Sequence, residues 1–156
     1  MTAAAARVRE ARMEDAGTLA VLATQLGYPS SAGEIAARLQ RIASEKDHVV
    51  LVAEGENGKP CGFADVASAI ALQSGPRAEL VGLVIEEAAR GHGIGRLLVA
   101  EAEQWAAAHG FAKLCVRCNV VRTRTHRFYE GLGFECSKTQ KYFLKPLAAA
   151  RQSRAT

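Results

Sequence analysis

The pattern of apolar and polar residues divides the chain near residue 48 into a helical part and a strand-rich part. Residues 6–12 alternate in the manner of a short strand. Over residues 13–27 apolar side chains recur at helical spacing, and a glycine ends this predicted helix. A second helix is expected after Ser31, because Glu34 stands three residues later and completes a capping box. The chain should therefore begin with one strand and two helices.

From residue 48 the pattern changes to that of strands. Residues 48–54 form an apolar strand, the Asn57-Gly58 pair is typical of a tight hairpin turn, and residues 61–72 form the returning strand. Gly75-Pro76 marks another turn. Residues 78–85 are apolar at nearly every position, and this predicts a strand inside the sheet rather than at its edge.

The last third of the chain alternates between helices and strands. A long helix is expected over residues 93–109, a strand over 114–118, a helix over 123–132, and one or two closing strands over 134–147. This order predicts one α/β (α+β) domain built around a single sheet and spanning all 156 residues. Its ordered core should cover about residues 6–147, followed by a short flexible C-terminal tail.

Composition limits the cellular setting and the classes of partner. The 49% of hydrophobic and 23% of charged residues are ordinary for a globular domain, and no run approaches the roughly 20 apolar residues that cross a membrane. Arginines near the N-terminus interrupt the apolar stretch that a signal peptide needs. We therefore expect a cytoplasmic protein with no membrane partner. The net charge of +4 permits a polyanionic ligand without requiring one.

Four cysteines raise the question of a metal site. Cys115 and Cys118 form a C-x-x-C pair, but residues three apart on a strand face opposite sides, and no second pair completes a zinc set. Reduced thiols and no metal are expected.

A glycine-rich loop follows the apolar strand and leads into the long helix. Glycines let the backbone turn tightly, and the free amides and dipole of a helix N-terminus favour a bound phosphate. The spacing fits neither a Walker loop, which needs a following Lys-Ser or Lys-Thr, nor the G-x-G-x-x-G dinucleotide fingerprint. A phosphate ligand is expected at these residues: Arg90, Gly91, His92, Gly93, Ile94, Gly95 and Arg96.

The loop resembles the Gln/Arg-x-x-Gly-x-Gly/Ala motif of the GNAT superfamily of N-acetyltransferases, with Arg90, Gly93 and Gly95 at the defining positions. A second block, residues 126–134, is similar to the family's Phe-Tyr-x-x-x-Gly-Phe segment. The resemblance covers about residues 6–147 and is nearest to bacterial small-molecule members. It implies a mostly antiparallel mixed sheet flanked by helices, with acetyl-CoA as acyl donor. It also implies direct transfer to a primary amine in a ternary complex.

The resemblance further implies that the strand over residues 78–85 splays from its neighbour and that the pantetheine arm lies in the gap. Gly82 would allow a bulge there. This nominates the amide of Leu83 to polarise the thioester carbonyl, with Val84 and Ile85 pairing to the pantetheine.

Glu79 is the candidate general base. It is the only acid in this apolar strand and stands eleven residues before Arg90, a spacing similar to that of a catalytic glutamate in the histone-acetyltransferase branch. Two alternatives stay open. Glu79 could instead form an ordinary salt bridge at the start of the strand, and ordered water could deprotonate the amine.

Other candidates belong to the last third of the chain. Tyr129 resembles the family tyrosine that protonates the departing thiolate, and its alternative role is that of a core aromatic beside Phe128. By resemblance, Phe128 and Asn119 contact the cofactor. Arg122 either reaches the cofactor's phosphates or is a solvated charge. The sequence departs here from the common family pattern, because Arg122 and Thr125 stand where many relatives have asparagine and alanine.

The acceptor should contact residues 26–34 and the strand that begins at Cys61. Three acids at most line this region (Glu34, Asp65 and Glu79), too few to bind a polycation such as an aminoglycoside. A small or amino-acid-like amine is expected, ahead of a protein N-terminus or lysine. A non-catalytic acyl-CoA binder is one alternative. A nucleic-acid module using the arginines between residues 117 and 127 ranks behind it, so no nucleic acid is expected as partner. The resemblance also allows a homodimer.

Overall fold

The computed structural model describes residues 5–148, so the predicted C-terminal tail lies almost wholly outside the described residues. Contacts divide the chain into two compact units, one ending at Arg117 and the other beginning at Cys118. Within the described residues, no helix has the length and apolar character needed to span a membrane.

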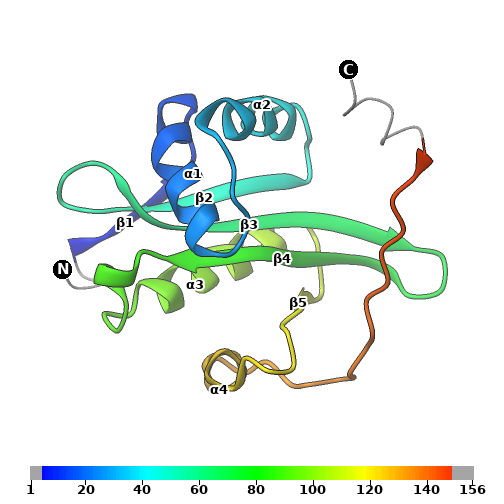
Figure 1. Ribbon diagram of the computed structural model, residues 1–156. Helices are drawn as coiled ribbons and strands as arrows, with labels where there is room; N and C mark the ends of the chain where they lie inside the picture. The colour runs from blue at the N-terminus through cyan, green and yellow to red at the C-terminus, as the bar shows by residue number, and fades with distance from the viewer. Residues whose placement is uncertain (1–4, 149–156) are drawn as a thin grey trace. The chain divides into compact units, whose positions relative to one another are not determined.

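The first unit contains a five-stranded sheet whose strands lie in chain order (Figure 1). The first four strands pair antiparallel, and the last pair is parallel. The predicted mixed, mostly antiparallel sheet is therefore confirmed. Its strands are β1 (Arg7–Glu10), β2 (His48–Glu54), β3 (Pro60–Ala71), β4 (Gly75–Ile85) and β5 (Leu114–Val116).

Helices α1 (Ala16–Gln25) and α2 (Ala32–Ala43) cover one face of this sheet, as Figure 1 shows. A short 3-10 turn, Met13–Asp15, precedes α1. The predicted capping box starts α2: the Ser31 hydroxyl accepts from the Glu34 amide at 3.1 Å, and the Glu34 carboxylate accepts from the Ser31 amide at 2.8 Å. The core beneath the two helices includes Leu19, Leu22, Leu39, Val50, Val52 and Val84.

Helix α3 (Ile94–Ala108) packs against β2, β3 and β4. Leu98 and Ala102 on its inner face are completely buried. Because α3 begins directly after the glycine-rich loop, this packing fixes the position of the loop at the end of β4.

The pairing of β3 with β4 contains one irregularity. Asp65 lies opposite Gly82, whereas the next residue, Val66, lies opposite Leu80, so Val81 is an extra residue on β4. The bulge predicted at Gly82 is thus confirmed. Such an extra residue bends its strand and increases the local twist.

The predicted turn at Gly75-Pro76 is wrong, because β4 already begins at Gly75 and the turn lies before it. The Ala78 amide donates toward β5, to the carbonyl of Lys113. Pro76 lies two residues earlier, so its nitrogen faces the same side of β4. Because β5 pairs with β4 only from Ala78 onward, no strand lies there to accept a hydrogen bond, and β4 tolerates a proline that cannot donate one.

The second unit contains the helix α4 (Thr123–Gly131), close to the predicted bounds. The closing strands predicted over residues 134–147 are wrong, because no strand forms in residues 134–148. A strand needs a partner to satisfy its backbone. The apolar run here is only Tyr142 to Leu144, between Lys141 and Lys145, and Pro146 removes a further donor.

Candidate active site

The side of β4 toward β5 is open over its second half. β5 pairs only with Ala78, Glu79 and Leu80. In the described chain up to Arg117, no strand pairs with residues 81–85 on that side. The two strands therefore part at the bulge and leave an edge to which an extended ligand could add like a strand.

The direction of the backbone groups along this edge follows from one hydrogen bond. The Glu86 amide donates to the Cys61 carbonyl at 2.8 Å, so these two opposed residues form a hydrogen-bonded pair. Because such pairs alternate along an antiparallel ladder, Val84 also directs its backbone toward β3, whereas Leu83 and Ile85 direct theirs to the open edge. Val84 therefore contributes a buried side chain, and the open edge carries the backbone groups of the other two.

The glycine-rich loop turns through two left-handed residues, Gly91 at φ 80° and Gly93 at φ 81°. Gly93 caps α3, and its carbonyl accepts the first helical hydrogen bond, from the Leu97 amide at 3.1 Å. The amides from residue 94 to residue 96 consequently have no helical acceptor. Together with the helix dipole, these donors would favour a bound anion at the end of the open β4 edge.

Side chains of the loop divide into one anchor and several exposed groups. Ile94 is buried to 1% exposure and holds the start of α3 in the core. His92 and Arg96 are exposed, and Gly95 is half-buried. Arg90 turns back, and its Nε donates to the Ile85 carbonyl at 3.0 Å. Residues 90–96 thus offer backbone donors with cationic side chains at their two ends.

Glu79 lies on β4 before the bulge, opposite Cys115 of β5. Its carboxylate is 3.0 Å from Nε of Arg117, and the Glu79 side chain is only 17% exposed. The salt bridge, one of the alternatives for Glu79, is therefore present, and the bulge separates this residue from Leu83 along β4.

The end of α1 packs over the bulge. A methyl group added to Gly82 would lie 3.7 Å from Cε2 of Phe63 and 3.9 Å from Cβ of Asp65 and Cδ2 of Leu26. The segment that joins α1 to α2 thus begins beside the bulge, on the sheet face that carries Phe63 and Asp65. This is the region where the sequence places acceptor contacts.

A half-buried pair on the same face was not predicted. Nε2 of His48 lies 2.5 Å from Oδ1 of Asp65. The two residues come from neighbouring strands, and only the register of the β2–β3 hairpin brings them together. The turn signal at Asn57-Gly58 locates the hairpin, but the register also depends on the shift between Ala53 and Glu54, which has no signal in the sequence.

In the second unit, Tyr129 is buried between two aromatic rings. Its ring contacts Phe128 and Phe134 edge-on, at centroid distances of 5.2 and 5.5 Å. Burial raises the pKa of Tyr129 to about 12. The phenol therefore stays protonated throughout the physiological range.

Asn119 and Arg122 stand at the start of α4. The Asn119 side-chain oxygen accepts from the Val121 amide at 3.2 Å, which leaves its side-chain NH2 group free of this turn. The backbone carbonyl of Asn119 lies 2.8 Å from Nε2 of His126. Arg122 is the N-cap residue of α4, and its side chain is exposed.

Comparison with known proteins identifies relatives over nearly the whole chain. A model of the acetyltransferase (GNAT) family matches residues 13–134. An aminoglycoside N(6')-acetyltransferase type 1 of Stenotrophomonas maltophilia is 28% identical over 151 residues, which cover 94% of this chain and 97% of that protein.

Two solved structures share the fold. A transcriptional regulator of Bacillus halodurans C-125 has a TM-score of 0.80 at 25% identity, covering 90% of this chain and 99% of that one. The aminoglycoside N-acetyltransferase AAC(6')-Iy in complex with CoA has a TM-score of 0.80 at 19% identity, covering 91% of this chain and 95% of that one.

Proposed function

The chain belongs to the acetyltransferase (GNAT) family and is an acyltransferase with acetyl-CoA as donor, and from this premise we propose how it acts and on what. The acceptor is the primary amine of a small molecule, and the acetyl group passes to it directly in a ternary complex. The name of the Stenotrophomonas maltophilia relative, an aminoglycoside acetyltransferase, supports a small-molecule acceptor.

One observation carries the proposal: the open edge of β4 runs into the free amides at the start of α3. Acetyl-CoA combines an extended arm with amide groups and a pyrophosphate. The backbone groups of Leu83 and Ile85 would pair with the arm, and the amides from residue 94 to 96 would hold the pyrophosphate. For the arm to reach the Ile85 carbonyl, the Arg90 side chain moves from it to the phosphates.

The chemistry then follows from the groups at the bulge. The amine nitrogen attacks the thioester carbon, and the carbon–sulfur bond breaks. The Leu83 amide, directed to the open edge, donates to the carbonyl oxygen as negative charge develops on it. Glu79, or water ordered by it, removes the proton of the amine, and Tyr129 donates a hydrogen bond to the departing sulfur.

The two units act as one transferase domain, and the family model supports this because its match crosses Arg117. The proposed cofactor contacts that belong to the second unit are Asn119, Arg122, Phe128 and Tyr129. A homodimer in the cytoplasm is the proposed state, supported by family resemblance, and light scattering of the purified protein tests the dimer.

Titration calorimetry with acetyl-CoA tests the cofactor site. Gly93→Glu places a carboxylate where the pyrophosphate binds and should abolish the binding seen with the wild type. Gly110→Glu is the matched control, because Gly110 follows the other end of α3 with the same φ of 81° and no neighbour in contact. If this control still binds acetyl-CoA although its backbone is strained to the same degree, the loss of binding in Gly93→Glu results from repulsion of the ligand and not from misfolding. A folded wild type that binds no acetyl-CoA would overturn the proposal.

Binding and turnover assays on the same purified protein distinguish the remaining candidate functions. Acetyl-CoA binding without turnover of any amine indicates a non-catalytic acyl-CoA binder, and turnover of peptides alone indicates a protein acetyltransferase. One similar structure is described as a transcriptional regulator, so duplex DNA is included as a ligand. DNA binding that falls steeply with salt, without acetyl-CoA binding, would support the nucleic-acid module.

A further inference from the structure

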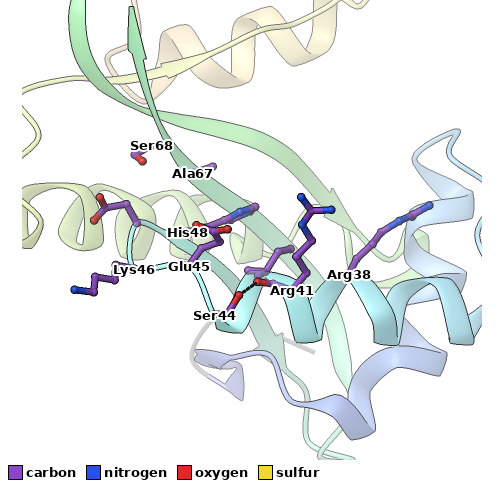
Figure 2. Close-up of a pocket in the computed structure, with 10 residues that line it drawn as sticks. Arg38, Arg41, Ser44, Glu45, Lys46, His48, Ala67 and Ser68 are labelled. Carbon is purple, nitrogen blue, oxygen red and sulfur yellow. Dashed lines mark hydrogen bonds between the residues drawn. The ribbon is translucent and has the colours of Figure 1, made fainter. Parts of the chain in front are cut away.

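A hollow of about 620 Å³ lies where the chain leaves α2 and enters β2, separate from the glycine-rich loop (Figure 2). Its floor includes His48 of β2 and two small residues of β3, Ala67 and Ser68. Two arginines of α2, Arg38 and Arg41, form one wall. The hollow is large enough for a small molecule or part of one.

The wall formed by α2 is cationic. Arg38 and Arg41 are three residues apart and therefore neighbours on one helix face. Figure 2 shows both side chains extending on the side of the helix where His48 lies, while Lys46 extends away from them. Nη1 of Arg38 donates to Ser30 at 3.0 Å, which leaves its other guanidinium donors available.

Neither arginine has a carboxylate partner in the described part of the chain. Glu45 and Asp47 also line the hollow, but no ion pair among residues 5–148 joins either of them to Arg38, Arg41 or Lys46. A guanidinium without a carboxylate partner is a preferred binding group for a carboxylate or phosphate, because its fork of donors matches two oxygens.

The hollow and the bulge share one face of the sheet. His48 lies opposite Ala67, and Ala67 lies opposite Glu79, so these side chains form one row across β2, β3 and β4. Two strand spacings separate His48 from Glu79, about 10 Å. The middle position is alanine, which leaves room above the sheet. His48 also contacts Asp65, which is opposite the bulge residue Gly82.

We propose that the hollow binds the anionic group, a carboxylate or a phosphate, of an acceptor whose amine reaches Glu79, about 10 Å from His48 along the row. Arg38 and Arg41 bind the anion, and the carboxylate of Glu79, at the other end of the row, attracts the amine together with Asp65, which lies opposite Gly82. The acceptor is therefore an amine that carries both charges, such as an amino-acid-like molecule or a phosphorylated amine. A polycation is repelled by the arginine wall. Only the position of the amine depends on the proposed acetyl transfer, and the binding of an anion in the hollow does not.

Direct binding tests the hollow without turnover. Inorganic phosphate and acetate are titrated separately into 15N-labelled protein at constant ionic strength. We expect saturable amide shifts at residues 44–48 and 67–68, lost in Arg41→Glu. Lys59→Glu changes the charge equally at the far end of β2, in the β2–β3 turn, and should keep them. Shifts with phosphate alone or acetate alone identify the anion. No saturable shifts with either anion, or shifts that persist in Arg41→Glu, would overturn the proposal.

Turnover of matched amines tests the link to the bulge. Each pair contains an anionic acceptor and its neutral analogue: an amino acid with its amide, and a phosphorylated amino sugar with the unphosphorylated sugar. Arg41→Glu should lower kcat/KM for the anionic members about 10- to 100-fold. The neutral members and the Kd of acetyl-CoA should change less than about twofold.

The two proposals fail in different ways. If acetyl-CoA does not bind, the proposed function fails, while the anion titration still reports on the hollow. If acetyl-CoA binds and polycationic aminoglycosides are turned over best, with no effect of Arg41→Glu, the inference about the acceptor is wrong and the acetyltransferase stands.

Discussion

The carboxylate of Glu79 is held by Arg117 across the only parallel strand pair in the described part of the sheet, with 3.0 Å between Oε1 and Nε. Glu79 lies on β4, and Arg117 directly follows β5, just where these two strands begin to separate. Because the Arg117 side chain is 64% exposed, the pair contributes at most about 1 kcal/mol to the free energy of unfolding. We expect the pair mainly to orient the Glu79 carboxylate beside the start of the open edge of β4.

We expect Glu79→Gln to lower kcat by about 10²- to 10⁴-fold, because a general base at the amine is lost. The Kd of acetyl-CoA, measured by calorimetry, should not change. Arg117→Gln keeps the carboxylate and only loosens its orientation, so kcat should fall no more than several-fold. A Glu79→Gln enzyme with wild-type kcat would leave ordered water as the base and Glu79 as a structural residue.

Leu83→Pro should lower kcat by about 10²- to 10³-fold, because it removes one donor to the developing oxyanion. The Leu83 amide faces the open edge, so its loss removes no bond to β3 and the Tm should change little. Val84→Pro is the opposite case: its amide belongs to the β3 ladder, and the variant should be strongly destabilised. Thermal unfolding and turnover of both variants check the assignment, which fails if Leu83→Pro keeps full kcat.

Tyr129→Phe should lower kcat by about 10- to 100-fold. The pKa of Tyr129 is raised to about 12, roughly 3.5 units above that of an ordinary thiol, so complete proton transfer to the sulfur would cost about 5 kcal/mol. The phenol therefore acts through a hydrogen bond, and its loss should cost less than that of a matched general acid.

The raised pKa of Tyr129 also predicts how kcat depends on pH. The protonated phenol exists below its pKa, so raising the pKa extends the active range to higher pH. We expect the kcat of the wild type to show no loss from this group up to about pH 10.5, where a phenol with the ordinary pKa of about 10 would be mostly ionised. A fall in kcat with a midpoint near pH 10 that is absent in Tyr129→Phe would contradict this.

Asp15→Asn should lower the free energy of unfolding at pH 7 by about 3 kcal/mol, because it leaves the Arg9 guanidinium without its main partner. Asp15 is 5% exposed, and its two oxygens accept from Arg9 at 2.8 and 3.0 Å. Glu14→Gln, in an exposed pair with Arg12, should change the free energy by less than about 0.5 kcal/mol. Urea unfolding of both variants makes the comparison.

The same pair predicts how stability depends on acid. The hydrogen bond from Arg9 lowers the pKa of Asp15 below its value in the unfolded chain. Stability from this carboxylate is therefore fully present above about pH 4 and is lost as the pH falls through the lower native pKa. In Asp15→Asn the free energy of unfolding should fall less between pH 5 and pH 2 than in the wild type. An unchanged dependence on pH would contradict the assignment.

Local signals in the sequence predicted much of the fold, including the glycine-rich loop that leads into α3. The strand over residues 48–54 and the capping box at Ser31 have the predicted positions, because each depends only on neighbours in the chain. The bulge was predicted from Gly82, although glycine only permits a bulge, and pairing with β3 produces it. The start of α3 at Gly93 was predicted because the loop and the helix are adjacent in sequence, and the phosphate ligand stays a prediction.

Pairing between distant residues could not be predicted in the same way. His48 meets Asp65 because two features together set the register of β2 and β3: the turn in which the Gly58 amide donates to the Gly55 carbonyl at 3.0 Å, and the register shift between Ala53 and Glu54. The closing strands failed for a related reason. Residues 134–147 contain only the short apolar run from Tyr142 to Leu144, and a strand forms only against a partner, which local sequence does not supply.

The brevity of β5 also affects the protein between catalytic cycles. An unpaired strand edge can recruit a strand from another chain and start aggregation. Here the edge after the bulge is only Leu83 to Ile85, and two glutamates follow it, so it is a poor template for a foreign strand. A bound acetyl-CoA arm would close this edge and, at a concentration 100 times its Kd, would add about 2.7 kcal/mol to the free energy of unfolding. The supply of acetyl-CoA in the cell would then regulate the folded lifetime of the enzyme as well as its rate.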